Sequence, residues 1–460
     1  MNFWDFEAWS FVLQMGFLSI ILLVANTLVR KVKFFKNSLM PVAVLGGFIA
    51  LIIRLTGICD SFLDDGFLNI ITYQALMIGF IALGLKVKKE GEAKASAKPL
   101  DSGMFIVSCY VLQGIIGIGL AFFLIPKFAA SGLLLTMGFG QGPGQANNIG
   151  MQFEMQGFVG GQAFGLSIAS IGFLWACVLG VIYLNVLKRK GKITTVAAED
   201  VVTEDNRVTD FEDIGEIPVS NAIDKFSIQI AFVLMTAVFS YLAMFLFTKA
   251  FELTIGGAFV ENTVKPLVWG FNFIFGMLVA MLVSKVMKAL KKFNIMKRQY
   301  PNNYMLNRIT GCAFDYMIIA SITVIDIAAL KELVLPLLII TTAGGIATFI
   351  YVKYMAKYIY PNYALEATLG FYGMMTGTMS SGMILIREVD PTFKTPAADA
   401  LVLGSGTGVL FGFPLLMLVG LAPKEPLLTF GLIILLFVIF EVALLRKLIF
   451  KKRNKGEKTL

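Results

Sequence analysis

Long apolar runs alternate with short polar segments along most of this chain. A membrane-spanning helix needs ~20 mostly apolar residues, and eleven runs reach or approach that length. The predicted spans are residues 8–29, 39–57, 67–86, 103–125, 160–187, 227–248, 267–286, 312–334, 335–352, 397–421 and 427–449. This pattern predicts an all-α integral membrane protein with about eleven spans.

Two glycine-rich segments interrupt the apolar pattern. Residues 138–150 lie between the fourth and fifth spans, and residues 370–382 lie between the ninth and tenth. Glycine and proline disrupt a continuous helix, and the amide side chains of the first segment would be unpaired in hydrocarbon. The flanking apolar runs are too short to cross the membrane alone. We therefore predict two re-entrant hairpins, over residues 130–158 and 361–386.

The two glycine-rich segments also match each other in sequence. Thr136-x-Gly138-Phe139 aligns with Thr368-x-Gly370-Phe371, and Gly150-Met151 aligns with Gly382-Met383 at the same offset. Five spans precede the polar connection, so the second half would be inverted in the membrane. The predicted division is a first repeat 1–187, an acidic cytosolic linker 188–226, a second inverted repeat 227–421, and an extra helix with a basic tail 422–460. Each repeat would contain five helices and one hairpin.

The charge distribution orients this topology. Hydrophobic residues make up 57% of the chain and charged residues 15%, against about 25% charged in soluble domains. With the N-terminus outside, nearly all of the 39 lysines and arginines fall in cytoplasmic segments, as the positive-inside rule expects. The exceptions are Lys127, Lys249, Lys265, Lys331, Lys424 and Arg54. The net charge of +9 is thereby explained without a nucleic-acid partner, and the C-terminus is predicted to be cytoplasmic.

The residue types present exclude several kinds of catalytic chemistry. The chain has no histidine, which removes Ser-His-Asp triads and His-containing zinc sites. Its four cysteines are far apart, so they predict neither a disulfide framework nor a zinc site. We expect no enzymatic activity and no organic cofactor.

The glycine-rich segments are the predicted ligand site. Hairpins that enter from opposite sides would meet near the midplane, where the N-termini of half-helices attract anionic groups. Side-chain amides and hydroxyls there could hydrogen-bond a small anionic substrate. The candidate binding residues are Gly140, Gln141, Gly142, Gln145, Asn147, Asn148, Thr376, Gly377, Thr378, Ser380 and Ser381. The alternative is that the small residues only allow helices to pack closely.

One acid is predicted to lie deep in a span. Asp326 falls within the predicted span 312–334, and an intramembrane carboxylate is a functional candidate because it is costly to bury. We assign it, with Thr378, as a candidate sodium ligand. The alternative is that Asp326 pairs with Lys331.

Several motifs give the chain a family resemblance over residues 10–420. Besides the two glycine-rich segments, they are Met40-Pro41-Val42-Ala43 with Gly46-Gly47, Ile81-Ala82-Leu83-Gly84-Leu85, and Arg387-Glu388-Val389-Asp390-Pro391. The chain resembles the bacterial sodium/glutamate symporter family. The resemblance implies a homodimer in the bacterial inner membrane, sodium as the coupling ion, and uptake of glutamate by an elevator-like movement.

Pattern and resemblance together predict a sodium-coupled secondary transporter for glutamate or a related small carboxylate. The alternative function is an ion or small-solute channel in which the two glycine-rich segments form the filter. A channel would pass currents far above the turnover of a carrier.

Overall fold

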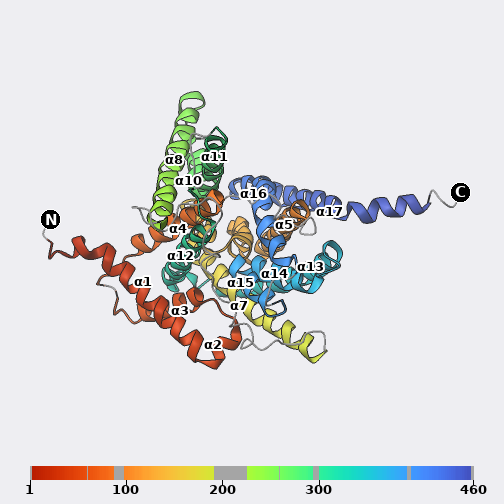
Figure 1. Cartoon of the computed structure of the whole chain (residues 1–460), viewed down its shortest axis with the longest axis horizontal. Coiled ribbons are helices and arrows are strands. Elements are labelled where there is room, and N and C mark those ends of the chain that lie inside the picture. The colour runs from red at the N-terminus through yellow and green to blue at the C-terminus, as the bar shows by residue number, and fades with distance from the viewer. Residues whose placement is uncertain are drawn as a thin grey trace. The chain divides into compact units, whose positions relative to one another are not determined.

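The computed structural model describes residues 3–59, 61–86, 98–190, 225–257, 260–293, 300–390 and 395–456. Within these ranges every regular element is a helix (Figure 1). Nine of the described helices are long and apolar enough to cross a membrane. They are α1 (Phe6–Lys31), α4 (Asp65–Leu85), α5 (Pro99–Leu124), α7 (Gly161–Arg189), α8 (Lys225–Thr254), α11 (Asn272–Lys292), α13 (Val334–Ile359), α16 (Ala397–Leu421) and α17 (Pro426–Gly456). The prediction of an all-α, multi-pass membrane protein is confirmed.

Two of the eleven predicted spans fall outside these nine helices. One corresponds to α3 (Val42–Leu55), an apolar helix of 14 residues. The other corresponds to α12 (Asn303–Thr323), so the predicted bounds 312–334 were wrong. This helix starts earlier than predicted because the Asn302 side chain caps it, accepting a 2.9 Å hydrogen bond from the Met305 amide. The count of eleven spans and the inverted repeat stay predictions.

The chain divides into two compact units. Unit 1 comprises Met1–Asn26, Val42–Glu92 and Ala197–Val324. Its helices α3, α4, α11 and α12 pack closely where glycines face large side chains: a Cβ on Gly79 would lie 2.2 Å from the Phe314 ring. The short segments η5 (Val260–Val264) and α10 (Lys265–Gly270) pack beside α8. Arg54 ties α3 to α4 through a 2.5 Å salt bridge with Asp65.

Unit 2 comprises Thr27–Pro41, Ala93–Val196 and Ile325–Leu460. Besides α5, α7, α13, α16 and α17 it contains shorter elements. These are α2 (Lys33–Ser38), η2 (Pro126–Leu133), η3 (Thr136–Gln141), α6 (Pro143–Met155), η6 (Ala328–Leu330), α14 (Ala364–Thr376) and α15 (Met379–Arg387). Both predicted hairpins therefore lie in unit 2. Each unit draws helices from both predicted repeats, and nearly all of the predicted linker 188–226 lies outside the described residues.

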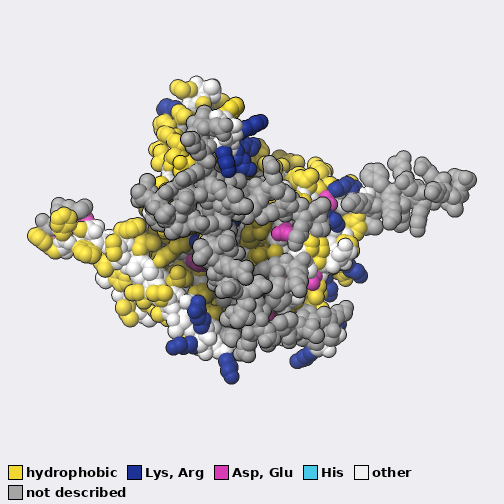
Figure 2. All heavy atoms as spheres, viewed as in Figure 1, with side chains coloured by type: hydrophobic (Ala, Val, Ile, Leu, Met, Phe, Trp, Pro, Cys, Tyr) yellow, Lys and Arg dark blue, Asp and Glu magenta, His cyan; other side chains and the backbone are white. Residues whose placement is uncertain are grey.

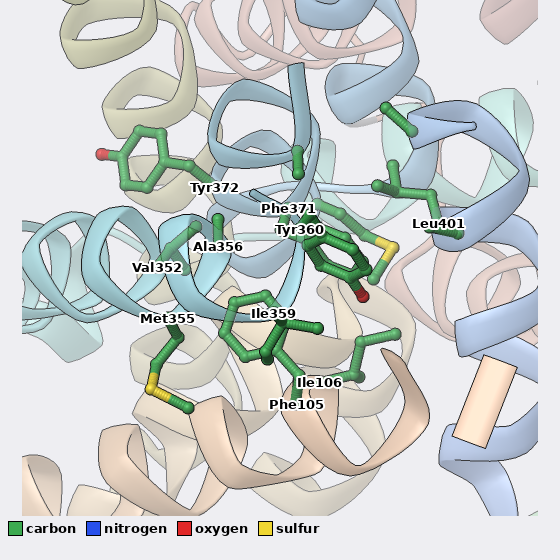
Figure 3. Packing of buried hydrophobic residues seen from close by; sticks show 14 of the residues in the cluster. Phe105, Ile106, Val352, Met355, Ala356, Ile359, Tyr360, Phe371, Tyr372 and Leu401 are labelled. Carbon is green, nitrogen blue, oxygen red and sulfur yellow. The ribbon is translucent and has the colours of Figure 1, made fainter. Parts of the chain in front are cut away.

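The core of unit 2 is an aromatic and aliphatic cluster formed by α5, α13, α14 and α16. Figure 3 shows Phe371 and Tyr360 close together, and the Phe105 ring lies against the Phe371 ring with centroids 4.9 Å apart. The Tyr360 ring stacks on the Phe371 ring with centroids 5.5 Å apart. This packing fixes α13 and α14 against α5, and α14 forms the first half of the second predicted hairpin.

The outer surfaces of several helices are apolar. Figure 2 shows hydrophobic side chains over α1 and α8. Phe11 and Leu23 of α1 and Leu234 and Leu246 of α8 are among the exposed residues. Exposed apolar faces of this kind are what helices in contact with lipid present.

Candidate binding site at two helix breaks

The first glycine-rich segment contains a break between two helices. The π-helical turn η3 ends at Gln141, and α6 starts at Pro143. Gly142 between them has φ +86°, a conformation that glycine adopts without steric cost. Proline suits the first position of α6 because it has no N–H to leave unsatisfied. The sequence Gly-Pro therefore sets both the break and the start of the new helix.

The second glycine-rich segment contains a similar break. Helix α14 ends at Thr376, Gly377 is non-helical, and α15 starts at Met379. Thr378 is extended and caps α15, its hydroxyl accepting from the Ser381 amide at 3.5 Å. With 13 residues in α6, 13 in α14 and nine in α15, none of these helices could cross a bilayer alone.

The two breaks lie next to each other inside unit 2. A Cβ on Gly142 would be 4.0 Å from the methyl carbon of Thr378. Gly172 of α7 lies against both segments, since a Cβ there would be 2.3 Å from the Thr376 carbonyl oxygen and 2.8 Å from the Phe139 ring. The structure thus brings Gly142 and Thr378 together, and the absence of a side chain at Gly172 permits the approach.

Two helix N-termini flank this junction. Helix α6 begins after Gly142, and α15 begins after Thr378. The first N–H groups of a helix have no intrahelical partner and carry the positive end of the helix dipole. An anion at the junction would be stabilised by both ends, as anions are at helix N-termini generally.

Gln145 carries the strongest indication of a ligand. It lies in the first turn of α6, is 1% exposed, and neither its Oε1 nor its Nε2 has a hydrogen-bond partner among the described protein groups. Buried polar groups are nearly always paired, and an unpaired amide costs about 1–3 kcal/mol. The side chain is therefore available to a molecule that enters the junction.

A second amide, which the sequence analysis did not select, joins the site from α5. Gln113 donates from Nε2 to the Met375 carbonyl at 2.8 Å and to the Thr348 hydroxyl at 3.1 Å. Its Oε1 is buried without a partner among the residues that the structure describes, 3.2 Å from the Cβ position of Gly140. A glutamine inside the apolar run 103–125 was the signal that could have identified it.

The other predicted residues of the first break have varied surroundings. Gly140 packs against the Tyr110 ring, where a Cβ would come within 2.3 Å. Gln141 is half-buried at the end of η3, and Asn148 is buried in α6. Asn147 is occupied in helix packing, because its Oδ1 accepts from Gln162 of α7 at 2.8 Å.

The hydroxyls of the second break are largely occupied by their own helices. Thr376 donates to the Tyr372 carbonyl at 2.9 Å. The Ser381 hydroxyl lies 3.5 Å from that of Thr378. Ser380 is exposed, whereas Gly377 is buried with its Cβ position 2.9 Å from the Ser381 hydroxyl.

Asp326 is not deep within a span, which corrects the prediction. It lies after the end of α12, and its Oδ1 accepts from the amides of Ala328 and Ala329 at 2.9 and 3.3 Å. Aspartate stabilises such turns by bonding to nearby backbone amides. The sequence analysis missed this turn because the residues on both sides are apolar. Sodium was assigned to Asp326 because it was predicted to lie deep in a span, so that assignment no longer has a basis.

No protein-family model, curated protein or solved structure matches the chain. The fold and the junction are therefore the basis on which function can be inferred. The many apolar helices of the chain indicate a multi-pass membrane protein of the general transporter or channel kind.

Proposed function

We propose that the protein is a secondary transporter that takes up glutamate or a related small carboxylate together with sodium. The observation that carries the proposal is the junction of the two helix breaks, with the buried amide of Gln145, unpaired among the described groups, in the first turn of α6. The motifs that resemble the sodium/glutamate symporter family support the substrate and the ion.

The chemistry of the junction favours an anionic ligand. The N-termini of α6 and α15 both favour negative charge. The Gln145 amide can donate to or accept from a ligand, and Gln113 can accept through Oε1, since its two N–H groups already donate to Met375 and Thr348. A carboxylate of an amino acid would use the helix N-termini, and its remaining polar groups would pair with the amides.

Sodium would use oxygen atoms near the second break. Helix α14 ends there, and carbonyl oxygens at helix C-termini and in unwound backbone hold sodium in transporters with broken helices. The Thr378 hydroxyl caps α15, so backbone carbonyl oxygens alone are assigned to sodium. This assignment replaces the one that used Asp326.

The division into two compact units supports an elevator-like cycle. Both breaks lie in unit 2, so a movement of unit 2 as a body would carry the ligand without dismantling the site. The cycle, the homodimer and the bacterial inner membrane are parts of the proposal that come from the resemblance.

Glutamate binding to purified protein tests the proposal. With sodium present, glutamate should raise the unfolding temperature, and Gln145→Ala should weaken the affinity about ten- to a hundredfold, the value of about 1.5–3 kcal/mol for a hydrogen bond to a charged group. Aspartate and dicarboxylates without an amino group would define the substrate class.

Gln156→Ala is the matched control. Gln156 follows α6 at its other end and is exposed, so its removal should leave the affinity unchanged. Equal affinities for parent, Gln145→Ala and Gln156→Ala would place the ligand elsewhere. Binding without any dependence on sodium would remove the coupling ion, and single-channel currents in bilayers would favour the channel instead.

A further inference from the structure

One end of α11 in unit 1 carries a group of exposed lysines. Helix α11 runs from Asn272 to Lys292 and contains no acidic residue. Near its end lie four exposed lysines, which we call the lysine cluster: Lys285, Lys288, Lys291 and Lys292. Figure 2 shows basic side chains next to hydrophobic ones over the part of the molecule that Figure 1 labels α8 and α11.

No protein group in the described part of the chain neutralises the lysine cluster. None of its four members forms an ion pair or a hydrogen bond with a described residue. Basic residues near the ends of helices in unit 2 do have partners: Arg446 of α17 pairs with Asp101 at 2.7 Å, and Lys353 of α13 lies over the Tyr183 ring. Like charges placed together repel one another, so an anion from outside the protein would stabilise the cluster.

The helix dipole accounts for only two of these lysines. The C-terminal end of a helix favours cations, and this effect is confined to the last turn. Lys291 and Lys292 lie in the last turn, whereas Lys285 and Lys288 precede it. Basic residues at one end of a span also set its orientation. A role in orientation alone would leave the purified protein without a preference for any lipid.

Two of the lysines continue a stripe of exposed apolar residues. Leu278, Leu282, Lys285 and Lys292 follow one another at spacings of four, three and seven residues, which returns to the same helix face at each step. Leu278 and Leu282 are 44% and 60% exposed, and α11 packs against α4 and α8 elsewhere on its surface. An apolar stripe that ends in positive charges matches a phospholipid, whose acyl chain adjoins a phosphate.

The length of α11 places the lysine cluster at the depth of the phosphates. With 21 residues the helix is about 31 Å long, close to the ~30 Å of a hydrocarbon core. Its last turn therefore reaches the headgroups. Lys285 lies about 10 Å before the end, and lysine side chains extend their ammonium groups toward the interface. The ammonium groups of Lys285, Lys288 and Lys292 can thus reach one headgroup.

We propose that the lysine cluster binds the phosphate of an anionic phospholipid, with an acyl chain of that lipid along Leu278 and Leu282. Lysines that follow directly on a membrane-spanning helix are typical of sites for anionic lipids. The ammonium group suits a phosphate because it is a compact charge with three donors. This site lies in unit 1, whereas both helix breaks lie in unit 2, so it does not depend on the proposed function.

Lipid binding to the purified protein in detergent tests the site. Phosphatidylglycerol and phosphatidylcholine with the same acyl chains differ in headgroup charge, and native mass spectrometry counts the bound molecules. The parent should retain phosphatidylglycerol in preference to phosphatidylcholine. A lysine near an anionic surface contributes about fivefold in affinity, so the combined Lys285→Gln, Lys288→Gln and Lys292→Gln variant should bind phosphatidylglycerol at least tenfold more weakly. A parent without preference for phosphatidylglycerol would overturn the proposal.

A second triple variant is the matched control. Lys127→Gln, Lys331→Gln and Lys424→Gln together remove three exposed lysines of unit 2, with the same change in net charge. This variant should bind phosphatidylglycerol as the parent does. Equal losses in the two triple variants would show a general attraction between opposite charges and would overturn the site on α11.

Leu282→Trp tests the position of the acyl chain. Phosphatidylglycerol with brominated acyl chains should quench the introduced indole, beyond the quenching seen in the parent, more strongly than brominated phosphatidylcholine does. Adding the three glutamine substitutions of the lysine cluster should abolish this difference. Equal quenching by the two lipids in Leu282→Trp would contradict a bound anionic lipid at this face.

Inorganic phosphate separates a lipid site from a site for free anions. At an ionic strength matched with chloride, phosphate should not displace brominated phosphatidylglycerol from Leu282→Trp, because it has no acyl chain to contact the apolar stripe. Displacement by phosphate beyond the chloride control would show that the cluster binds free anions and would overturn the assignment to a lipid.

Discussion

The two helix breaks of unit 2 resemble each other in sequence but differ in how their polar groups are satisfied. At the first break, Gly142 adopts a positive φ, and neither polar atom of Gln145 has a partner within the described part of the chain. At the second, the Thr376 hydroxyl bonds to its own helix and Thr378 caps the next one. The first break therefore has side-chain hydrogen-bonding groups that a ligand could use. At the second break, the Thr376 and Thr378 hydroxyls make hydrogen bonds within the protein.

This difference predicts that the two breaks contact the ligand through different groups. Gln145 and Gln113 would recognise the polar groups of the ligand, because both amide atoms of Gln145 and the Oε1 of Gln113 are buried without a partner among the described residues. The second break would contribute a helix N-terminus and carbonyl oxygens, which need no particular side chain. Substitutions at the first break should therefore affect ligand affinity most.

Gly142→Val should have the largest effect. A β-branched residue at φ +86° is strained by about 1–3 kcal/mol or more. Its side chain would also extend toward Thr378, because the Cβ position is already 4.0 Å from that methyl group. We expect at least a hundredfold loss of glutamate affinity, measured by calorimetry, with the helical content by circular dichroism unchanged.

Gly157→Val separates strain from position. Gly157 has φ +98°, lies after the end of α6, and has no atom within 4 Å of its Cβ position. It should lose stability as Gly142→Val does and keep the parent affinity. Equal losses of affinity in the two variants would mean that general strain, and not the junction, controls binding.

Gln145→Met should separate affinity from stability. Methionine has a similar shape and no amide, so it removes a buried group that costs about 1–3 kcal/mol when unpaired. The ligand-free variant should unfold at or above the parent temperature, while glutamate affinity falls at least tenfold. Gln113→Met should behave oppositely in stability, because it deprives the Met375 carbonyl and the Thr348 hydroxyl of their donor.

Scanning fluorimetry of Gln145→Met and Gln113→Met without ligand would test these opposite changes in unfolding temperature. A lower unfolding temperature for Gln145→Met would show that its amide has a structural partner. A neutral Gln113→Met would mean that its two hydrogen bonds contribute little, and that Gln113 is held in place by other contacts.

The sequence predicted the broken segments well because the reason for each break is local. Gly142 and Pro143 cannot continue a helix, and Gly377 precedes a capping threonine. Which amides would be free depended on tertiary packing and could not be predicted. Asn147 and Gln145 look alike in sequence, but only Asn147 meets Gln162 of a neighbouring helix.

Asp326 and Glu441 also show that hydropathy alone does not predict the surroundings of an acidic side chain. Both are single acids among apolar residues. Asp326 ends up in a turn because its carboxylate bonds to two backbone amides. Glu441 stays within a helix because hydroxyls from two other helices bond to it. A hydropathy pattern records neither the local competition for backbone amides nor the partners on distant helices.

Thr378→Ala tests the second break. Its effect on glutamate affinity should be smaller than that of Gly142→Val or Gln145→Met. The hydroxyl caps α15, but at 3.5 Å from the Ser381 amide the bond is long, so the loss should be near the low end for a cap, about 0.5 kcal/mol. Thr378→Ser should restore the cap.

Thr376→Ala removes a hydroxyl that bonds back to its own helix and should be neutral. Because the second break would supply backbone groups to the ligand, glutamate affinity should change less than threefold in all three variants. A tenfold loss in Thr378→Ala at unchanged stability would show that this hydroxyl contacts the ligand or its sodium ion, and the two breaks would then share recognition equally.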